Sequence, residues 1–140
     1  MLTSHEIQLI KRSWSLFLNI DPSVVGNAFY GKLFFDRPEL RRMFPHQMDA
    51  QHVKLLQMLS TIVMRIDRPE EITDEIIALA KRHGGYGVKP EHYKSVGDAL
   101  VWTLKTGMGS EWNEELEHAW RKCFSSLSNK MITATEKPAH

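Results

Sequence analysis

The amino-acid sequence predicts a single all-α domain. Hydrophobic residues recur with a helical period along almost the whole chain, the alternation typical of β-strands is absent, and prolines and glycines divide the chain into segments of helical length. A chain of 140 residues has the size of one ordinary domain. A core of that size needs no disulfide or metal to hold it together. We expect residues 1–133 to form the domain and residues 134–140 to be a frayed polar tail.

Each expected helix has a recognisable start or stop. The capping box Thr3-x-x-Glu6 opens the first, because the two side chains can each satisfy a free backbone amide. Asp21 precedes a proline at the first position of the second, where the missing N–H costs nothing. Gly107 and Gly109 are expected to end the sixth. After the first two helices, the expected ranges are 38–43, 49–66, 70–83, 90–106 and 112–132.

Composition excludes several classes of function. The chain carries 18 Lys and Arg against 17 Asp and Glu, a formal net charge of +1. Nucleic-acid and anionic-membrane binders need clustered positive charge, so neither partner is expected. The single cysteine, Cys123, excludes an internal disulfide and a paired-cysteine metal site, and we read it as a packing residue. The sequence has neither an apolar run of membrane-spanning length nor a secretory signal, so we expect a cytoplasmic protein.

The residues that could carry chemistry gather around one histidine. His83 ends an expected helix, but a histidine there most often interacts with the helix C-terminus, so alone it is weak evidence for a ligand. Gln51 and Leu55 are four residues apart and share one face of the middle helix. Together with Tyr30 they suggest an all-α pocket with polar tips opposite His83. Its apolar ring would comprise Phe44, Leu79, Val88 and Val96. Apart from His52, the other histidines are expected at the surface.

In order and spacing these residues resemble the globin family over nearly the whole chain. Residues 79–97 are similar to the proximal region of neuroglobin and of bacterial single-domain haemoglobins. The resemblance implies a globin fold, about seven helices enclosing one pocket for haem b. The residues that carry it are Trp14, Gly26, Tyr30, Pro38, Phe44, Gln51, Leu55, His83, Tyr93 and Trp120.

The resemblance also implies a role for each site residue. His83 would be the proximal ligand to the haem iron, as a neutral imidazole. Tyr30, Gln51 and Leu55 would line the gas-binding side, where hydroxyl and amide donate hydrogen bonds to the gas. Such a bond should contribute roughly 1–2 kcal/mol, about ten-fold slower release. Gly26 would let two crossing helices approach closely. The other residues in contact with haem would be Phe44, Lys54, Leu79, Val88, Tyr93 and Val96.

Two of these assignments have alternatives. Rotating the middle helix by one residue would make His52 the distal residue, where it could bind the iron directly as in neuroglobin. Gln51 is favoured because its separation from His83 matches bacterial haemoglobins and because it continues an apolar stripe with Leu55. Against it, the residue after the distal one is often small in globins, and His52 is not. Lys54 could reach a haem propionate or simply be solvated.

Three functions fit this interpretation. The first is reversible binding of oxygen or another diatomic gas such as NO or CO, as in oxygen transport. The second is nitric oxide dioxygenase activity, which would need a separate reductase, because no reductase domain follows residue 140. The third is a stand-alone gas or redox sensor acting through a partner protein. We expect a monomer or a small homo-oligomer. A scaffold without cofactor is disfavoured because His83 and Phe44 are both present.

Overall fold

A computed structural model of the chain describes residues 2–72, 74, 76–80 and 89–136. Within these residues it contains helices, turns and loops and no strand, which confirms the predicted all-α class. Residues 76–80 are helical as well. The α-helices are α1 (Ser4–Phe17), α2 (Pro22–Asp36), α3 (Asp49–Met64), α5 (Pro90–Met108) and α6 (Glu114–Glu136), and the 3-10 helices are η1 (Pro38–Met43), η2 (Pro69–Ile72) and η3 (Gly109–Glu111).

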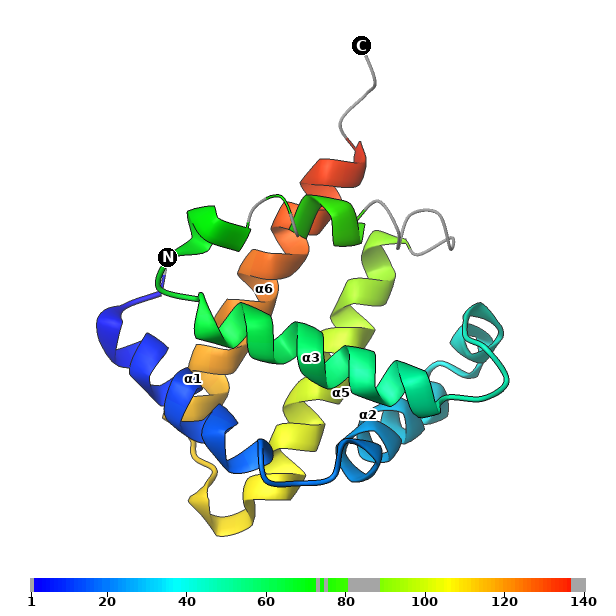
Figure 1. Cartoon of the computed structure of the whole chain (residues 1–140), viewed down its shortest axis with the longest axis horizontal. Coiled ribbons are helices and arrows are strands. Elements are labelled where there is room, and N and C mark those ends of the chain that lie inside the picture. The colour runs from blue at the N-terminus through cyan, green and yellow to red at the C-terminus, as the bar shows by residue number, and fades with distance from the viewer. Residues whose placement is uncertain (1, 73, 75, 81–88, 137–140) are drawn as a thin grey trace.

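The helices pack at steep angles around one core (Figure 1). α3 crosses in front of α5 and α6 in this view. α2 packs against both α3 and α5, while α6 packs against α1 and α5. One cluster of buried side chains joins all five long helices, and it includes Ile10, Trp14, Phe29, Leu59, Leu104 and Trp120. None of the helices that the structure describes is both long enough and apolar enough to cross a membrane.

The first two helices begin where the sequence predicts. The Thr3 hydroxyl accepts a hydrogen bond from the Glu6 amide at 3.1 Å, and the Glu6 carboxylate accepts one from the Thr3 amide at 2.8 Å. The Asp21 carboxylate accepts a hydrogen bond from the Ser23 amide at 2.9 Å. These contacts are local in sequence, which is why the pattern alone was enough to place them.

The end of α5 lies two residues beyond the prediction, at Met108. Gly107 stays helical, and a Cβ there would lie 2.6 Å from the ring of Phe17, so this glycine makes room for α1. Gly109 ends the helix, with a φ of 57° that favours glycine. Of the two glycines expected to terminate α5, one is therefore a packing residue and the other is the stop.

Four further boundaries differ from the prediction. α6 begins at Glu114 because the Asn113 side chain accepts a hydrogen bond from the Leu116 amide at 2.9 Å, and it extends to Glu136. α3 ends at Met64, two residues early. The helix expected over 70–83 instead opens with η2, a 3-10 helix headed by a proline that has no N–H to donate. Its expected end at residue 83 lies outside the described residues.

Two residues, Cys123 and His92, are buried. Burial was expected for the first and not for the second. Cys123 is buried, as its packing role requires, and burial raises the pKa of its thiol to about 12. His92 was expected at the surface but is buried. Its Nδ1 accepts a hydrogen bond from the Lys89 amide at 2.9 Å. His92 therefore caps the first turn of α5 from inside the fold.

Candidate functional site

Tyr30 lies on the buried face of α2, with 5% of its surface exposed. Burial raises the pKa of its hydroxyl, and a side-chain hydrogen bond with Gln51 acts in the opposite direction. Gln51 is half-buried in the first turn of α3. Two polar side chains from different helices, both expected on the gas-binding side, therefore meet at one point between α2 and α3.

Four rings surround the Tyr30 phenol. Phe29 and Phe44 meet it edge-on, with ring centroids 4.7 and 5.3 Å away. Phe34 and His52 lie nearly parallel to it, with centroids 5.8 and 5.7 Å away and interplanar angles of 25° and 24°. The Tyr30–Gln51 contact is therefore a polar point in largely apolar surroundings, where a hydrogen bond is stronger than in water.

α2 and α3 approach each other closely at Gly26. A Cβ on this residue would lie 2.5 Å from both Cδ2 and Cγ of His52, closer than real atoms come. The prediction that Gly26 permits a close helix crossing is thus confirmed. His52 is 5% exposed, and its Nδ1 has no hydrogen-bond partner among the described residues. The large residue after Gln51 is accommodated because its neighbour on α2 is the smallest possible one.

Arg41 holds the loop that carries Phe44. Its Nη1 donates to the carbonyl oxygens of Phe44 and Pro45 at 3.3 and 3.0 Å, and its Nη2 donates to that of His46 at 2.9 Å. The guanidinium also lies 5.6 Å from the ring centroid of Phe34. Sequence reasoning missed this residue, because contacts from a long side chain to backbone carbonyls leave no pattern in the sequence.

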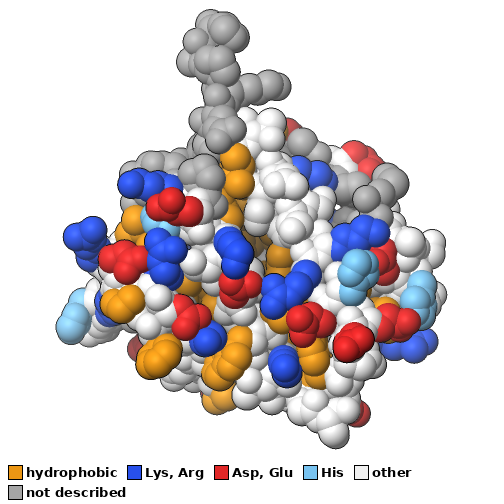
Figure 2. Space-filling view, turned by 180° about the vertical axis from the view of Figure 1, so that it is seen from behind, with side chains coloured by type: hydrophobic (Ala, Val, Ile, Leu, Met, Phe, Trp, Pro, Cys, Tyr) orange, Lys and Arg blue, Asp and Glu red, His pale blue; other side chains and the backbone are white. Residues whose placement is uncertain are grey.

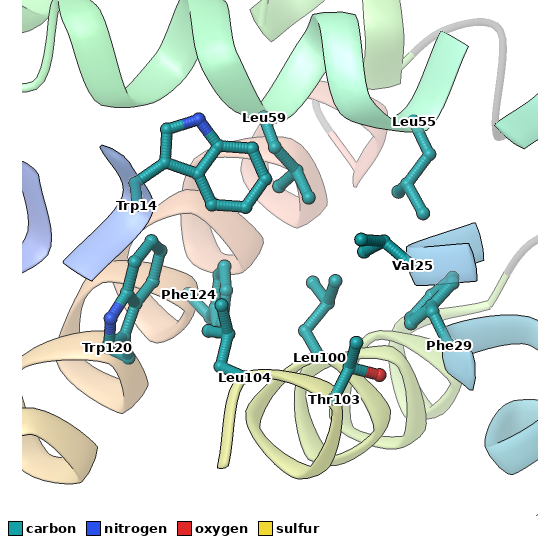
Figure 3. Close-up of a pocket in the computed structure, with 10 residues that line it drawn as sticks. All are labelled: Trp14, Val25, Phe29, Leu55, Leu59, Leu100, Thr103, Leu104, Trp120 and Phe124. Carbon is teal, nitrogen blue, oxygen red and sulfur yellow. The ribbon is translucent and has the colours of Figure 1, made fainter. Parts of the chain in front are cut away.

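Leu55 is buried one turn after Gln51 and faces the core (Figure 3). There it helps to line an apolar cavity of about 10 Å³, with Leu59 beside it on α3. The hydroxyl of Thr103, which also lines this cavity, donates to the carbonyl of Ala99 at 2.8 Å. The other lining residues are Trp14, Val25, Phe29, Leu100, Leu104, Trp120 and Phe124.

The two site residues on α5 are both half-buried. Val96 packs against the main core. Tyr93 lines a groove of about 370 Å³ between α5 and α6, and burial raises the pKa of its hydroxyl. Asp98, which lines the same groove, pairs with Lys94 at 3.2 Å and with Arg121 at 3.0 Å.

Seen from behind, the molecule carries acidic and basic side chains interspersed on one face (Figure 2).

Two further predicted site residues, Leu79 and Lys54, are not among the ring contacts of Tyr30. Leu79 is half-buried and packs against a second, smaller cluster that contains Ile76, Ala80 and Met131. Lys54 is exposed on α3. The predicted contacts at His83 and Val88 fall outside the described residues.

The described part of the site supplies the residue types that a haem site uses, apolar side chains and one polar pair. A haem needs apolar walls for its macrocycle and a nitrogen ligand for its iron. Half-buried apolar side chains that pack on the core leave part of their surface uncovered, among them Met43, Phe44, Met48, Met58 and Val96. The polar pair is Tyr30 and Gln51. The predicted nitrogen ligand, at position 83, lies beyond the described residues.

This chain belongs to the globin family, which matches residues 27–131. It is 29% identical to the flavohemoprotein of Vibrio cholerae over 94% of this chain and 34% of that protein. It is 27% identical to neuroglobin of Tetraodon nigroviridis over 93% of this chain and 90% of that protein. An engineered carbene transferase, described as a putative nitric oxide dioxygenase from Rhodothermus marinus, superposes with a TM-score of 0.84 at 25% identity, covering 95% of this chain and 92% of that one.

The family match and the structural similarity confirm the predicted globin fold. The chain spans about a third of the length of the flavohemoprotein it matches.

Proposed function

We propose that this protein binds haem b and, at its iron, a diatomic gas such as oxygen, NO or CO. The observation that carries the proposal is the Tyr30–Gln51 contact, a pair of neutral donors among aromatic rings in a chain of the globin family. Both side chains can donate a hydrogen bond to a gas without bringing a net charge into an apolar pocket.

In this proposal His83 is the proximal iron ligand. A haem supplies the ferrous iron at which a gas binds. Tyr30 keeps its proton at neutral pH because the ordinary pKa of a tyrosine hydroxyl is 10.0 and burial raises it further, so Tyr30 acts as a donor. Gln51 offers a second donor, and the rings around Tyr30 shield the Tyr30 hydroxyl from water that would compete for it. The other proposed haem contacts are Phe44, Lys54, Leu55, Leu79, Val88, Tyr93 and Val96.

Titration of the purified protein with haemin tests the role of His83. We expect a saturable, one-to-one absorption change with the unmodified chain, and loss of stable haem retention in His83→Ala because the iron loses its protein ligand. His118→Ala is the matched control, since His118 is an exposed histidine on α6. Full retention by His83→Ala, or equal loss in both variants, would refute the assignment.

A second candidate function is nitric oxide dioxygenase activity, with electrons from a separate reductase. It is favoured by the similarity to the putative nitric oxide dioxygenase from Rhodothermus marinus and to a flavohemoprotein. Nitrate formation from NO and oxygen, measured with a supplied reductase, separates the two candidates. Rapid, repeated turnover would favour the dioxygenase, and a single turnover would favour gas binding. Oxygen transport, a sensor role, a cytoplasmic location and a monomeric or small oligomeric state stay predictions.

A further inference from the structure

The ring contacts of Tyr30 differ in where they come from. Phe29 and Phe34 lie on α2, as Tyr30 itself does, and Phe44 follows η1. Among the ring contacts that the structure describes, the one from α3 is made by His52. α3 also carries Gln51, whose side chain interacts with the Tyr30 hydroxyl and lowers its pKa. His52 therefore links the Tyr30 ring to α3, the helix that also carries Gln51.

We propose that His52 is a positioning residue, which fixes the Tyr30 ring so that its hydroxyl is directed at the gas together with Gln51. The inference rests on the proposed gas-binding function and deepens it. Two consecutive residues of α3 would then act on one tyrosine: Gln51 on the hydroxyl, and His52 on the face of the ring.

The surroundings of His52 leave its ring little freedom. On the side of α2 it fills the space that Gly26 leaves, where a Cβ would come within 2.5 Å of its ring carbons. It lies nearly parallel to Tyr30, and 5% of its surface is exposed. A side chain packed between a helix backbone and a phenol in this way resists rotation, and it transmits that restraint to the phenol.

Hydrogen bonding at Nδ1 does not explain the place of His52 in the structure. Nδ1 is buried and has no hydrogen-bond partner among the described residues, an arrangement that disfavours folding. We infer that the imidazole acts here as a flat ring of the right size. A phenylalanine should therefore replace it, whereas an alanine should not. An iron ligand would behave differently, because phenylalanine offers no nitrogen.

Tyrosine ring flipping measures the restraint directly. The chain has three tyrosines, so ring-labelled protein gives a simple NMR spectrum in which Tyr30→Phe identifies the Tyr30 signals. On the full chain as purified, reduced and under carbon monoxide, we expect slow flipping of Tyr30 in the unmodified protein and in His52→Phe. We expect fast flipping in His52→Ala. Val53→Ala, an exposed neighbour on α3, is the matched control and should leave Tyr30 unchanged.

Gas binding gives the second readout. In His52→Ala we expect oxygen release to rise toward the roughly ten-fold increase expected of Tyr30→Phe, and the C–O stretching band of the carbon monoxide complex to shift the same way. In His52→Phe both should stay near those of the unmodified protein.

Three results would overturn the proposal. They are fast flipping of Tyr30 in the unmodified protein, slow flipping in His52→Ala, and a His52→Phe protein that behaves like His52→Ala. The first needs no variant, so a variant that fails to fold does not remove the test. Ring flipping can be measured whether or not haem is bound. If the haem proposal fails, the protein will be colourless. If the proposal for His52 fails, the flipping rate of Tyr30 will not depend on the residue at position 52.

Discussion

Gly26 shows how one missing side chain decides the geometry of the site. Its place in α2 lets the ring of His52 approach the helix backbone and reach Tyr30. Gly31, five residues later in the same helix, has open space around its Cβ position. The two glycines therefore provide a matched pair, in which the same substitution meets a crowded place and an empty one.

Gly26→Ala should destabilise the protein by about 1–3 kcal/mol, because the new methyl group overpacks the crossing of α2 and α3. Gly31→Ala should be neutral or stabilising by up to about 1 kcal/mol, since alanine favours a helix over glycine. Urea unfolding at equal protein concentration measures both changes. If the two variants lose equal stability, the close approach at Gly26 does not explain its role. His52→Ala added to Gly26→Ala should restore part of the loss.

Tyr30→Phe removes the donor hydroxyl and keeps the ring. We expect oxygen release about ten-fold faster, because one hydrogen bond of roughly 1–2 kcal/mol to the gas is lost. Stopped-flow displacement of oxygen by carbon monoxide measures the rate. Ser15→Ala, which removes an exposed hydroxyl on α1 instead, should leave the rate unchanged. An unaltered rate in Tyr30→Phe would mean that its hydroxyl does not reach the gas.

At the scale of helices, Glu6 joins the start of α1 to α6. Its carboxylate accepts hydrogen bonds from the Thr3 amide at 2.8 Å and from the Lys122 ammonium at 3.0 Å. These interactions, the backbone hydrogen bond foremost, lower the pKa of Glu6 to about 2. A carboxyl with a lowered pKa stabilises the folded state at pH values above its unfolded pKa, near 4.5. That stability is lost as the pH falls from about 4.5 through about 2.

Glu6→Gln tests this junction, since glutamine can keep the cap but not the charge. We expect a lower urea midpoint than the unmodified protein at pH 7 and a smaller difference between the two as the pH falls from 4.5 toward 2. Glu114→Gln, at the exposed start of α6, is the control and should have little effect at either pH. A constant difference between Glu6→Gln and the unmodified protein across this pH range would contradict the account.

The starts of the helices could be predicted more readily than their ends. The cap at Thr3 depends on residues three positions apart, so the sequence pattern contains all of it. The helical conformation of Gly107 goes with its contact to Phe17, which lies 90 positions away in the chain. Likewise, the sequence predicts His92 at the surface, whereas the folded structure buries it and shows that it accepts a hydrogen bond from the Lys89 amide.

Across the whole molecule, the fold and family could be predicted from the ordered set of residues, while the roles given to the site residues stay predictions. The pairing of Tyr30 with Gln51 was expected. The position of His52 was left open, because a one-residue rotation of α3 changes which side chain faces α2. The sequence did contain a useful signal. The space that Gly26 leaves beside α2 is filled by a large side chain from α3, and His52 has such a side chain. The role of Arg41 in holding the Phe44 loop had no such signal.

We propose that His83 binds the haem iron and that Tyr30 and Gln51 lie on the gas-binding side. In this proposal His52 positions Tyr30 and does not bind the iron. The visible absorption spectrum of the reduced, gas-free protein tests this most directly. We predict a single broad visible band, the sign of an open position at the iron, because His52 packs against Gly26 and Tyr30. Two sharp bands would mean that a second protein side chain binds the iron. A protein that stays colourless with added haemin would contradict the account as a whole.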